Sequence, residues 1–295
     1  MLGELFINWH VNPVLVHLGP IQIRWYSLLF VSGFIFGWFQ FKSFFKREGV
    51  RETLLDPLLF TLLIATIVGA RLGHCLFYDP AYYFGSWSGF LEVFMPWKGG
   101  LASHGGAIAL LLAMWWFVHR YGRANGFDFV WILDRLCITV ALAGCMIRCG
   151  NLFNSEIYGT ATSLPWGMVY ELRGETDPRH PTQMYEALSY FLLWCVMIGL
   201  YKFRLDKMYR GMFFGLFLIV CFGVRFLLEY TKETLVPWPD VTPMTMGQIL
   251  SIPFIIAGIV ILVMAFVKKI PARTDHPDKP GRTPKESTHY AKSLR

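Results

Sequence analysis

Seven long stretches of hydrophobic residues, separated by short polar segments, dominate the chain. Each approaches the ~20 residues that an α-helix needs to cross the hydrocarbon core of a bilayer. They run over residues 20–41, 55–77, 101–119, 128–148, 183–202, 211–230 and 246–267. The apolar residues follow one another without the alternation of a strand, and a backbone in lipid must satisfy its own hydrogen bonds. The pattern therefore predicts an all-α, polytopic membrane protein with about seven transmembrane helices.

Composition supports a membrane protein, and the positions of the basic residues argue against nucleic-acid binding as the reason for the net positive charge. The chain is 55% hydrophobic and 16% charged, whereas about 25% of the residues in soluble domains are charged. A net charge of +7 would suit nucleic acid, but the basic residues fall in short clusters between apolar stretches, as in membrane proteins. We therefore expect the lipid bilayer as the surroundings and no nucleic-acid partner.

Lysine and arginine are distributed unevenly between the two sets of loops. Eighteen follow the odd-numbered stretches, and four lie on the other side: Lys98, Arg173, Arg179 and Lys232. Because cytoplasmic loops carry the excess of basic residues, the N-terminus is predicted outside and the C-terminus in the cytoplasm. The first ten residues lack a basic region, so the first helix is expected to act as its own insertion signal.

The polar segments predict the domain organisation. We expect a single transmembrane helical domain over residues 1–270, with external elaborations near 79–100 and 149–182. The polar, proline-containing stretch 271–295 predicts a disordered cytoplasmic tail. The six cysteines form no Cys-x-x-Cys pair and are interpreted as packing residues. No metal ion and no cofactor is expected.

A cluster of polar residues stands where the fourth hydrophobic stretch ends. Arg148 is followed by Asn151, Asn154, Glu156 and Gly159. An arginine beside hydrocarbon is energetically expensive and usually marks a binding site or a pathway. This cluster is therefore the first candidate for a functional site.

Apart from Lys202, the last residue of the fifth stretch, which is counted with the basic residues that follow it, the hydrophobic stretches contain arginine but no lysine. The five arginines are Arg24, Arg71, Arg135, Arg148 and Arg225. A guanidinium group binds phosphate through two parallel hydrogen bonds, which favours a phosphodiester ligand. The alternative is that these arginines pair with acidic residues to hold helices together. The available partners are Asp56, Asp134, Glu156, Glu186 and Glu229.

Four polar residues share one depth if the predicted helices alternate in direction. Tyr26 and His104 begin the first and third stretches, Arg148 ends the fourth, and Arg225 lies in the outer third of the sixth. Histidine titrates near neutral pH and can accept a proton from a nucleophile. A histidine hydrogen-bonded within a helix bundle is the alternative, but its depth beside two arginines favours the functional interpretation. Asp134 lies near the cytoplasmic end of its stretch, so it and Arg135 are assigned a structural role.

These residues resemble the prolipoprotein diacylglyceryl transferase family. The segment from Arg148 to Gly159 is similar to the family pattern Gly-Arg-x-Gly-Asn-Phe-x-Asn-x-Glu-x-x-Gly. It departs at two places: Cys145-Met146-Ile147 stands before the arginine where a glycine is usual, and Leu152-Phe153 inverts the apolar pair. Further similar segments are Arg24-Trp25-Tyr26, Gly69-Ala70-Arg71, His104-Gly105-Gly106, His180-Pro181-Thr182-Gln183-Met184-Tyr185-Glu186, Arg225 to Glu229 and Gly247-Gln248-Ile249-Leu250-Ser251-Ile252-Pro253. The resemblance covers nearly the whole chain except the tail. Cys221 stands where the family often has a tyrosine.

The resemblance implies a bacterial inner-membrane enzyme with its active site toward the periplasm. Such an enzyme transfers the diacylglyceryl group of phosphatidylglycerol to the lipobox cysteine in the signal peptide of a prolipoprotein, and it releases glycerol 1-phosphate. We expect Arg148 and Arg225 to bind and stabilise the phosphate and His104 to act as the base. Tyr26, Asn151 and Glu156 are expected to orient the headgroup glycerol. Gly159 is expected to shape the loop, and Glu229 to hold Arg225.

Two other classes of protein remain open at this point. A transporter or lipid-binding membrane protein could use the same arginines for anionic cargo, and it would carry polar residues through the bilayer to the cytoplasm. A purely structural membrane scaffold would leave the outer polar cluster without an explanation.

Overall fold

The computed structural model describes residues 6–19, 21–232 and 244–273. Its long helices are α1 (Trp25–Glu48), α2 (Leu55–Phe77), α5 (Ser103–Phe117), α7 (Phe129–Phe153), α8 (Thr182–Arg204), α9 (Met212–Leu228) and α10 (Met246–Lys268). Short helices are α3 (Pro80–Gly85), α4 (Trp87–Val93) and α6 (Arg123–Asn125). Each predicted hydrophobic stretch contains one long helix, which confirms the all-α, polytopic architecture.

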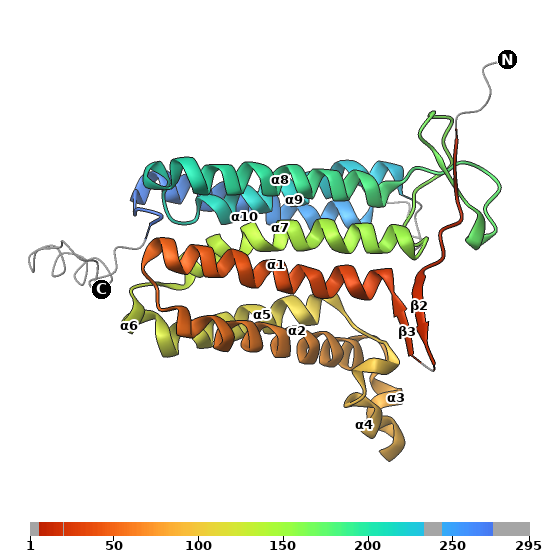
Figure 1. The fold of residues 1–295 in the computed structure, drawn as a ribbon, viewed down its shortest axis with the longest axis horizontal. Helices are drawn as coiled ribbons and strands as arrows, with labels where there is room; N and C mark the ends of the chain where they lie inside the picture. Colours follow the sequence, from red (N-terminus) through yellow and green to blue (C-terminus); the bar gives the residue numbers. More distant parts are fainter. Residues whose placement is uncertain (1–5, 20, 233–243, 274–295) are drawn as a thin grey trace, which may run out of the picture. The chain divides into compact units, whose positions relative to one another are not determined.

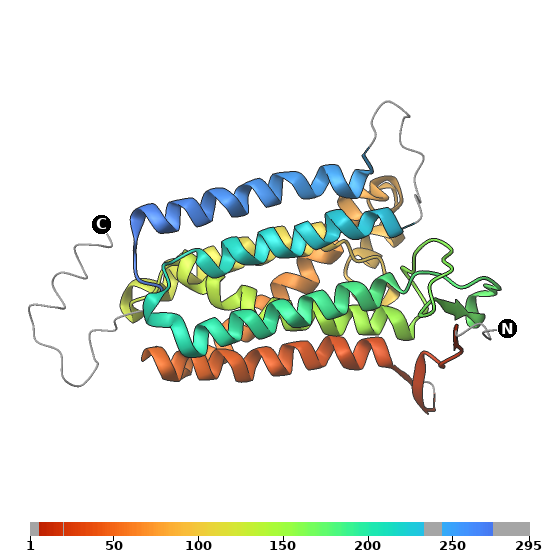
Figure 2. The same cartoon turned by 90° about the horizontal axis from the view of Figure 1, so that it is seen from above.

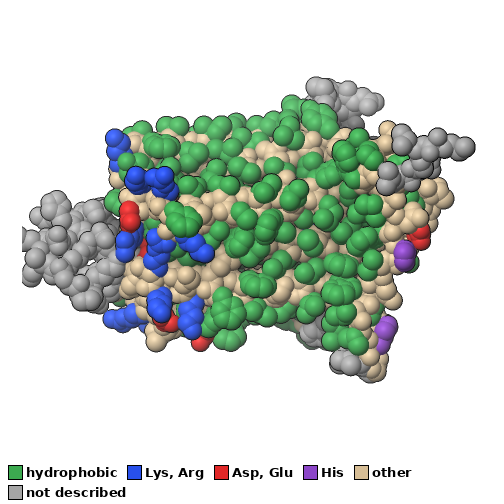
Figure 3. Space-filling model, turned by 45° about the horizontal axis from the view of Figure 1, so that its top comes forward, with side chains coloured by type: hydrophobic (Ala, Val, Ile, Leu, Met, Phe, Trp, Pro, Cys, Tyr) green, Lys and Arg blue, Asp and Glu red, His purple; other side chains and the backbone are tan. Residues whose placement is uncertain are grey.

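Six helices in the described part of the chain are long and apolar enough to cross a membrane. The remaining predicted stretch, the third, forms α5, which has 15 residues and continues into a π-helical turn over Val118–Gly122. Hydrophobic side chains cover the helices along their length in Figure 3, and lysine and arginine gather at one end. The count of seven crossings and the orientation of the termini stay predictions.

Three helix boundaries differ from the prediction by five residues or more, one of them because α1 continues to Glu48 instead of ending at residue 41. The first helix begins at Trp25 because Ile21–Arg24 forms a strand, β3, that pairs antiparallel with β2 (Val14–Leu18). The fourth helix, α7, continues to Phe153 instead of ending at residue 148. A second pair of short strands, β1 (Ile7–Trp9) and β4 (Met168–Tyr170), is parallel.

The chain divides into two compact units. The first comprises the chain up to Gln40 together with Leu133–Arg273, and the second comprises Phe41–Ile132. A single domain over residues 1–270 stays a prediction. Ala272 is buried in the first unit, and the rest of the predicted tail, 274–295, lies outside the described residues.

The first unit is built on helices that pack around α7. Gly33 of α1 lies against Ala143, and Gly144 lies against the ring of Tyr190 on α8. Figures 1 and 2 show α1, α7 and α8 side by side, with the strands and the chain between α7 and α8 at the end where α7 stops. This end of the unit contains the polar cluster that follows Arg148.

Asp134 and Arg135 have the structural role expected of them. Both side chains are fully buried. The Asp134 carboxylate accepts hydrogen bonds from the backbone N–H groups of Gly211 (2.8 Å) and Phe214 (2.9 Å) at the start of α9. Arg135 donates to the carbonyl of Ala272 over 2.7 Å. The pair therefore ties α7 to the beginning of α9 and to the chain after α10.

The second unit contains α2 and α5 in close contact. A Cβ added to Gly73 would lie 2.7 Å from the Cα of Gly105, so glycine is required where the helices touch. Arg71 is buried, and its guanidinium donates to the carbonyl of Gly99 over 2.6 Å and to that of Val93 over 3.2 Å. Its role is therefore to hold the external segment 79–100, and it is not a candidate phosphate ligand.

Candidate functional site

The extension of α7 places the first part of the site on a helix. Arg148 and Asn151 lie three residues apart and therefore face the same side. The chain then leaves the helix through Ser155 and Ile157, which have φ values of 51° and 61°. Positive φ is uncommon for residues other than glycine, and strained residues of this kind cluster at functional sites.

Arg148 is held by two neighbours. Its Nε forms an ion pair with the carboxylate of Glu186 on α8, and its Nη1 donates to Asn151 Oδ1 over 3.2 Å. The Glu186 side chain is only 1% exposed, and it also accepts a hydrogen bond from Lys232 Nζ over 2.6 Å. One buried carboxylate therefore lies between two cations.

Sequence reasoning missed this role of Glu186 and Lys232. Glu186 was only one of several possible acidic partners, and Lys232 was counted as a basic residue of an external loop. The useful signal was the position of Glu186 in the first turns of α8, at the same end of the unit as the end of α7.

Glu156 is positioned by amide groups. Its Oε1 accepts from Asn151 Nδ2 over 2.8 Å and from Asn154 Nδ2 over 3.2 Å, while its backbone carbonyl accepts from Gln183 Nε2 over 2.7 Å. Asn151 is buried, so its amide links Glu156 directly to Arg148. The predicted residues Arg148, Asn151 and Glu156 thus form one continuous network.

Tyr26 belongs to the same group. It lies in the first turn of α1 and packs against Gly150, where an added Cβ would lie 2.8 Å from the tyrosine ring. Its hydroxyl is within electrostatic range of Glu156 and Arg148. Gly150 is therefore needed so that the tyrosine can approach the network.

Arg225 is the free cation of the described site. It is half-buried on α9, and its guanidinium makes no hydrogen bond or ion pair with another described residue. Cys221, one turn earlier, is within electrostatic range of Arg225, Arg148 and Glu186, and it is hydrogen-bonded to the Tyr190 hydroxyl. Guanidinium groups from α7 and α9 therefore both lie within electrostatic range of Cys221.

Glu229 lies beyond the end of α9. Its carboxylate is 3.9 Å from Lys232 Nζ and packs against Gly247, where an added Cβ would collide with it. Among the described residues no ion pair joins it to Arg225. Its predicted function of holding Arg225 stays a prediction.

Gly159 lies where two distant segments cross. Its N–H donates to the carbonyl of His180 over 2.8 Å, and it forms an antiparallel bridge with Lys232. A Cβ at this position would meet the backbone of Thr231. The absence of a side chain at Gly159 therefore lets Lys232 reach Glu186.

Replacing Gly159 by alanine is expected to destabilise the protein by about 1–3 kcal/mol, as overpacked sites do. The collision involves backbone, so the segment carrying Lys232 must move. Thermal unfolding in detergent measures the effect, with Gly174→Ala as the control because nothing lies within 4 Å of an added Cβ there. Since φ at Gly174 is +73°, that control carries only backbone strain. An equal loss of stability in Gly159→Ala and Gly174→Ala would contradict the conclusion that the backbone of Thr231 leaves no room for a side chain at residue 159.

The segment between α7 and α8 has its own charge network. The Tyr158 hydroxyl donates to Glu175 Oε1 over 2.7 Å, and Arg179 Nε donates to Oε2 over 2.9 Å. The hydrogen bond from Tyr158 lowers the pKa of Glu175, and Arg179 acts in the same direction. The stability that ionised Glu175 contributes is fully present above the ordinary pKa of a carboxyl group, and it is lost as the pH falls through the lowered pKa of Glu175.

His104 belongs to the second unit. It lies in the first turn of α5, where its side chain is exposed. The next residue, Gly105, is required for contact with α2, so the glycine pair serves helix packing. The predicted role of His104 as a base stays a prediction.

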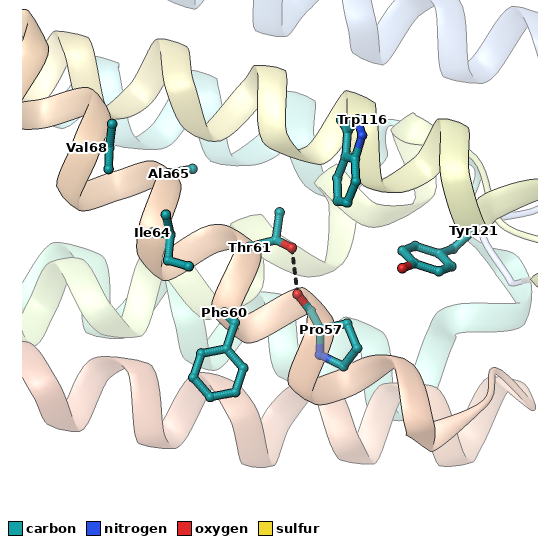
Figure 4. Close-up of a pocket in the computed structure, with 8 residues that line it drawn as sticks. All are labelled: Pro57, Phe60, Thr61, Ile64, Ala65, Val68, Trp116 and Tyr121. Carbon is teal, nitrogen blue, oxygen red and sulfur yellow. Dashed lines mark hydrogen bonds between the residues drawn. The ribbon is translucent and has the colours of Figure 1, made fainter.

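Two hollows differ sharply in chemistry. An apolar groove of about 470 Å³ lies between α2 and α5. Figure 4 shows the residues that line it, with Trp116 and Tyr121 toward one end. A second pocket, of about 260 Å³, lies in the first unit and includes Glu156. Only the second is continuous with the network around Arg148. Among the described residues, no group of three or more His, Cys, Asp or Glu side chains is placed to hold a metal ion.

Comparison with known proteins identifies relatives along almost the whole chain. A curated protein of Tolumonas auensis is 43% identical over 261 residues, which cover 88% of this chain and 98% of the relative. One of Bacteroides fragilis is 41% identical and covers 90% of this chain and 97% of the relative. One of Porphyromonas gingivalis is 40% identical, and the match covers 88% of this chain and 95% of the relative. All three are named phosphatidylglycerol–prolipoprotein diacylglyceryl transferase.

The family model described as prolipoprotein diacylglyceryl transferase matches residues 13–264. This range includes every helix from α1 to α9 and most of α10. It also contains the polar network on α7, α8 and α9 together with His104. The chain therefore belongs to the prolipoprotein diacylglyceryl transferase family.

Proposed function

We propose that this chain transfers the diacylglyceryl group of phosphatidylglycerol to the thiol of a lipobox cysteine in a prolipoprotein. The products are a thioether and glycerol 1-phosphate. Family membership and the names of the relatives support the two substrates. The reaction is the first step in the maturation of bacterial lipoproteins.

The arrangement of Arg148 and Arg225 is the observation that carries the proposal. Arg148 is anchored by Glu186, whereas Arg225 has no partner among the described residues. An anionic phosphodiester can therefore bind Arg225 without breaking an ion pair. Because guanidinium offers two parallel donors, the two arginines suit the oxygens of one phosphate.

The proposed reaction develops negative charge on the phosphate group that these arginines bind. The cysteine sulfur attacks a glycerol carbon of the lipid, a C–S bond forms, and the C–O bond to phosphate breaks. The bonding electrons remain on the phosphate oxygen, so negative charge grows on the leaving group. Fixed cations stabilise such developing charge. The thiol proton must pass to a base, because the thiolate is the nucleophile.

The remaining polar residues orient the headgroup. Tyr26, Asn151 and Glu156 are joined to Arg148 and offer both donors and acceptors to glycerol hydroxyls. The Tyr190 hydroxyl lies beside Cys221. It supplies a phenol near the position where the family often has a tyrosine.

The orientation of the chain completes the proposal. Basic residues follow the C-terminal ends of α1, α8 and α10, which is typical of the cytoplasmic side. The network around Arg148 lies at the opposite ends of α1 and α8. We therefore place the site toward the periplasm, in a multi-pass protein of the bacterial inner membrane.

The transporter alternative loses its main support in the structure. It requires polar residues along the membrane-spanning part, and Asp134 and Arg135 lie within such a stretch. Both are committed to fixed contacts with the start of α9 and with Ala272.

A transfer assay tests the proposed function. Purified protein is incubated with phosphatidylglycerol and a lipobox peptide, and the peptide is analysed by mass spectrometry. The proposal requires a mass gain of one diacylglyceryl group on the cysteine. A peptide with serine in place of that cysteine is the control. Binding of both substrates without a mass gain would contradict the enzyme.

Replacing His104 by glutamine is expected to lower the transfer rate by about 10²- to 10⁴-fold, the usual contribution of a positioned base. Glutamine keeps hydrogen bonding but cannot accept the thiol proton. Initial rates between pH 6 and 9 provide the readout, because loss of a base should flatten the pH profile. His119→Gln, a change of an exposed histidine near the other end of the same helical segment, is the control. A near-normal rate would assign His104 a structural role.

A further inference from the structure

A small polar pocket lies immediately outside the network of Arg148. Its volume is about 260 Å³, below the ~300–1,000 Å³ of pockets that hold drug-sized ligands. It is lined by Pro13, Arg24, Asn154, Ser155, Glu156, Leu172 and Arg173. The size suits a small polar molecule and leaves no room for acyl chains.

The wall formed by the chain after α7 carries unused hydrogen-bonding groups. Ser155 is only 2% exposed, and its Oγ is buried without a partner. The Oδ1 atom of Asn154 is also buried without a partner. Buried polar groups in folded proteins are nearly always hydrogen-bonded, so two orphans in one pocket call for a ligand or water. A hydroxyl and an amide oxygen together match a ligand that carries hydroxyl groups.

Two arginines supply positive charge to the same pocket. Arg24 is exposed at the end of β3, and its guanidinium makes no hydrogen bond or ion pair with another described residue. Arg173 donates from Nε to the carbonyl of Ser155 and from Nη2 to that of Asn154, each over 3.0 Å. These bonds fix the strained turn and hold the guanidinium at the pocket. The facing carboxylate, Glu156, already accepts from Asn151 and Asn154 through Oε1.

We infer that this pocket binds the glycerol phosphate released by the reaction. Arg24 and Arg173 bind the phosphate, while Asn154 Oδ1 and Ser155 Oγ bind the glycerol hydroxyls. The inference rests on the proposed function, which generates a glycerol phosphate next to Arg148. Glu156 belongs both to that network and to the pocket. The product therefore moves past Glu156 toward Arg24 on its way to the aqueous phase.

Direct binding tests the pocket without relying on turnover. Isothermal titration of the detergent-solubilised protein is performed with glycerol 1-phosphate, inorganic phosphate and glycerol. We expect glycerol 1-phosphate to bind more tightly than either part alone. Arg24→Gln should weaken binding at least tenfold. Arg120→Gln removes the same charge from an exposed arginine of the second unit and should leave binding unchanged.

Kinetics separate the free product from the lipid headgroup. In the transfer assay, Arg24→Gln should raise the inhibition constant of added glycerol 1-phosphate at least tenfold, while the KM for phosphatidylglycerol changes less than twofold. Equal product binding by wild type and Arg24→Gln would overturn the inference. A parallel rise in KM would also overturn it, because the pocket would then hold the intact headgroup. A wild-type protein without transfer activity would instead refute the proposed function.

Discussion

Replacement of Arg148 or Arg225 by lysine is expected to reduce diacylglyceryl transfer by about 10²- to 10³-fold, as loss of one transition-state donor does. Lysine keeps the positive charge but provides a single point charge instead of the planar fork. The loss should fall mainly on kcat, because charge on the phosphate is greatest as the C–O bond breaks. Initial rates over a range of phosphatidylglycerol concentrations separate kcat from KM.

A matched control comes from the same unit. Arg179→Lys changes an arginine that pairs with Glu175 in the segment between α7 and α8. This variant should retain a rate within a few-fold of wild type. Full activity in both Arg148→Lys and Arg225→Lys would show that neither guanidinium acts on the reacting phosphate.

Glu186 should be the most sensitive residue for stability. Its buried carboxylate lies between Arg148 and Lys232, so Glu186→Gln removes the counter-charge that the two cations share and leaves Lys232 only the more distant Glu229. Breaking a buried ion pair costs about 3–5 kcal/mol. Because Arg148 and Lys232 are 18% and 16% exposed, solvent screens part of the repulsion, and about 2–4 kcal/mol is expected. Thermal unfolding in detergent, together with the transfer rate, provides the measurement.

Two further variants make the Glu186 prediction specific. Glu175→Gln neutralises a carboxylate that is far less buried and should cost less. Adding Lys232→Met to Glu186→Gln removes one of the two repelling cations and should restore part of the lost stability. A double variant less stable than Glu186→Gln alone would contradict the proposed charge balance.

The sequence was most informative where the physics is local. Helix positions follow from the length of apolar runs, because lipid permits few alternatives to a helix. The network of Arg148 with Asn151 follows from their three-residue spacing on one helix, and Glu156 follows only a few residues later. The start of α1 was harder to predict, since Ile21–Arg24 directly precedes the apolar run of the helix but pairs with β2.

The sequence was least informative where distant segments meet. Lys232 looked like a loop charge, and its contact with Glu186 depends on how the chain crosses at Gly159. The hydrogen bond between Tyr190 and Cys221 joins two helices, so spacing along the chain could not reveal it. Arg71 resembled the other membrane arginines, yet its partners are backbone carbonyls, which carry no sequence signal.

Lipid binding by the two arginines tests the central claim most directly. Native mass spectrometry would compare phosphatidylglycerol with diacylglycerol, which has the same acyl chains but no phosphate, on wild type and on Arg148→Ala/Arg225→Ala. The account predicts that wild type retains phosphatidylglycerol in preference to diacylglycerol and that the double variant loses this preference. Equal retention of phosphatidylglycerol by both proteins would contradict it.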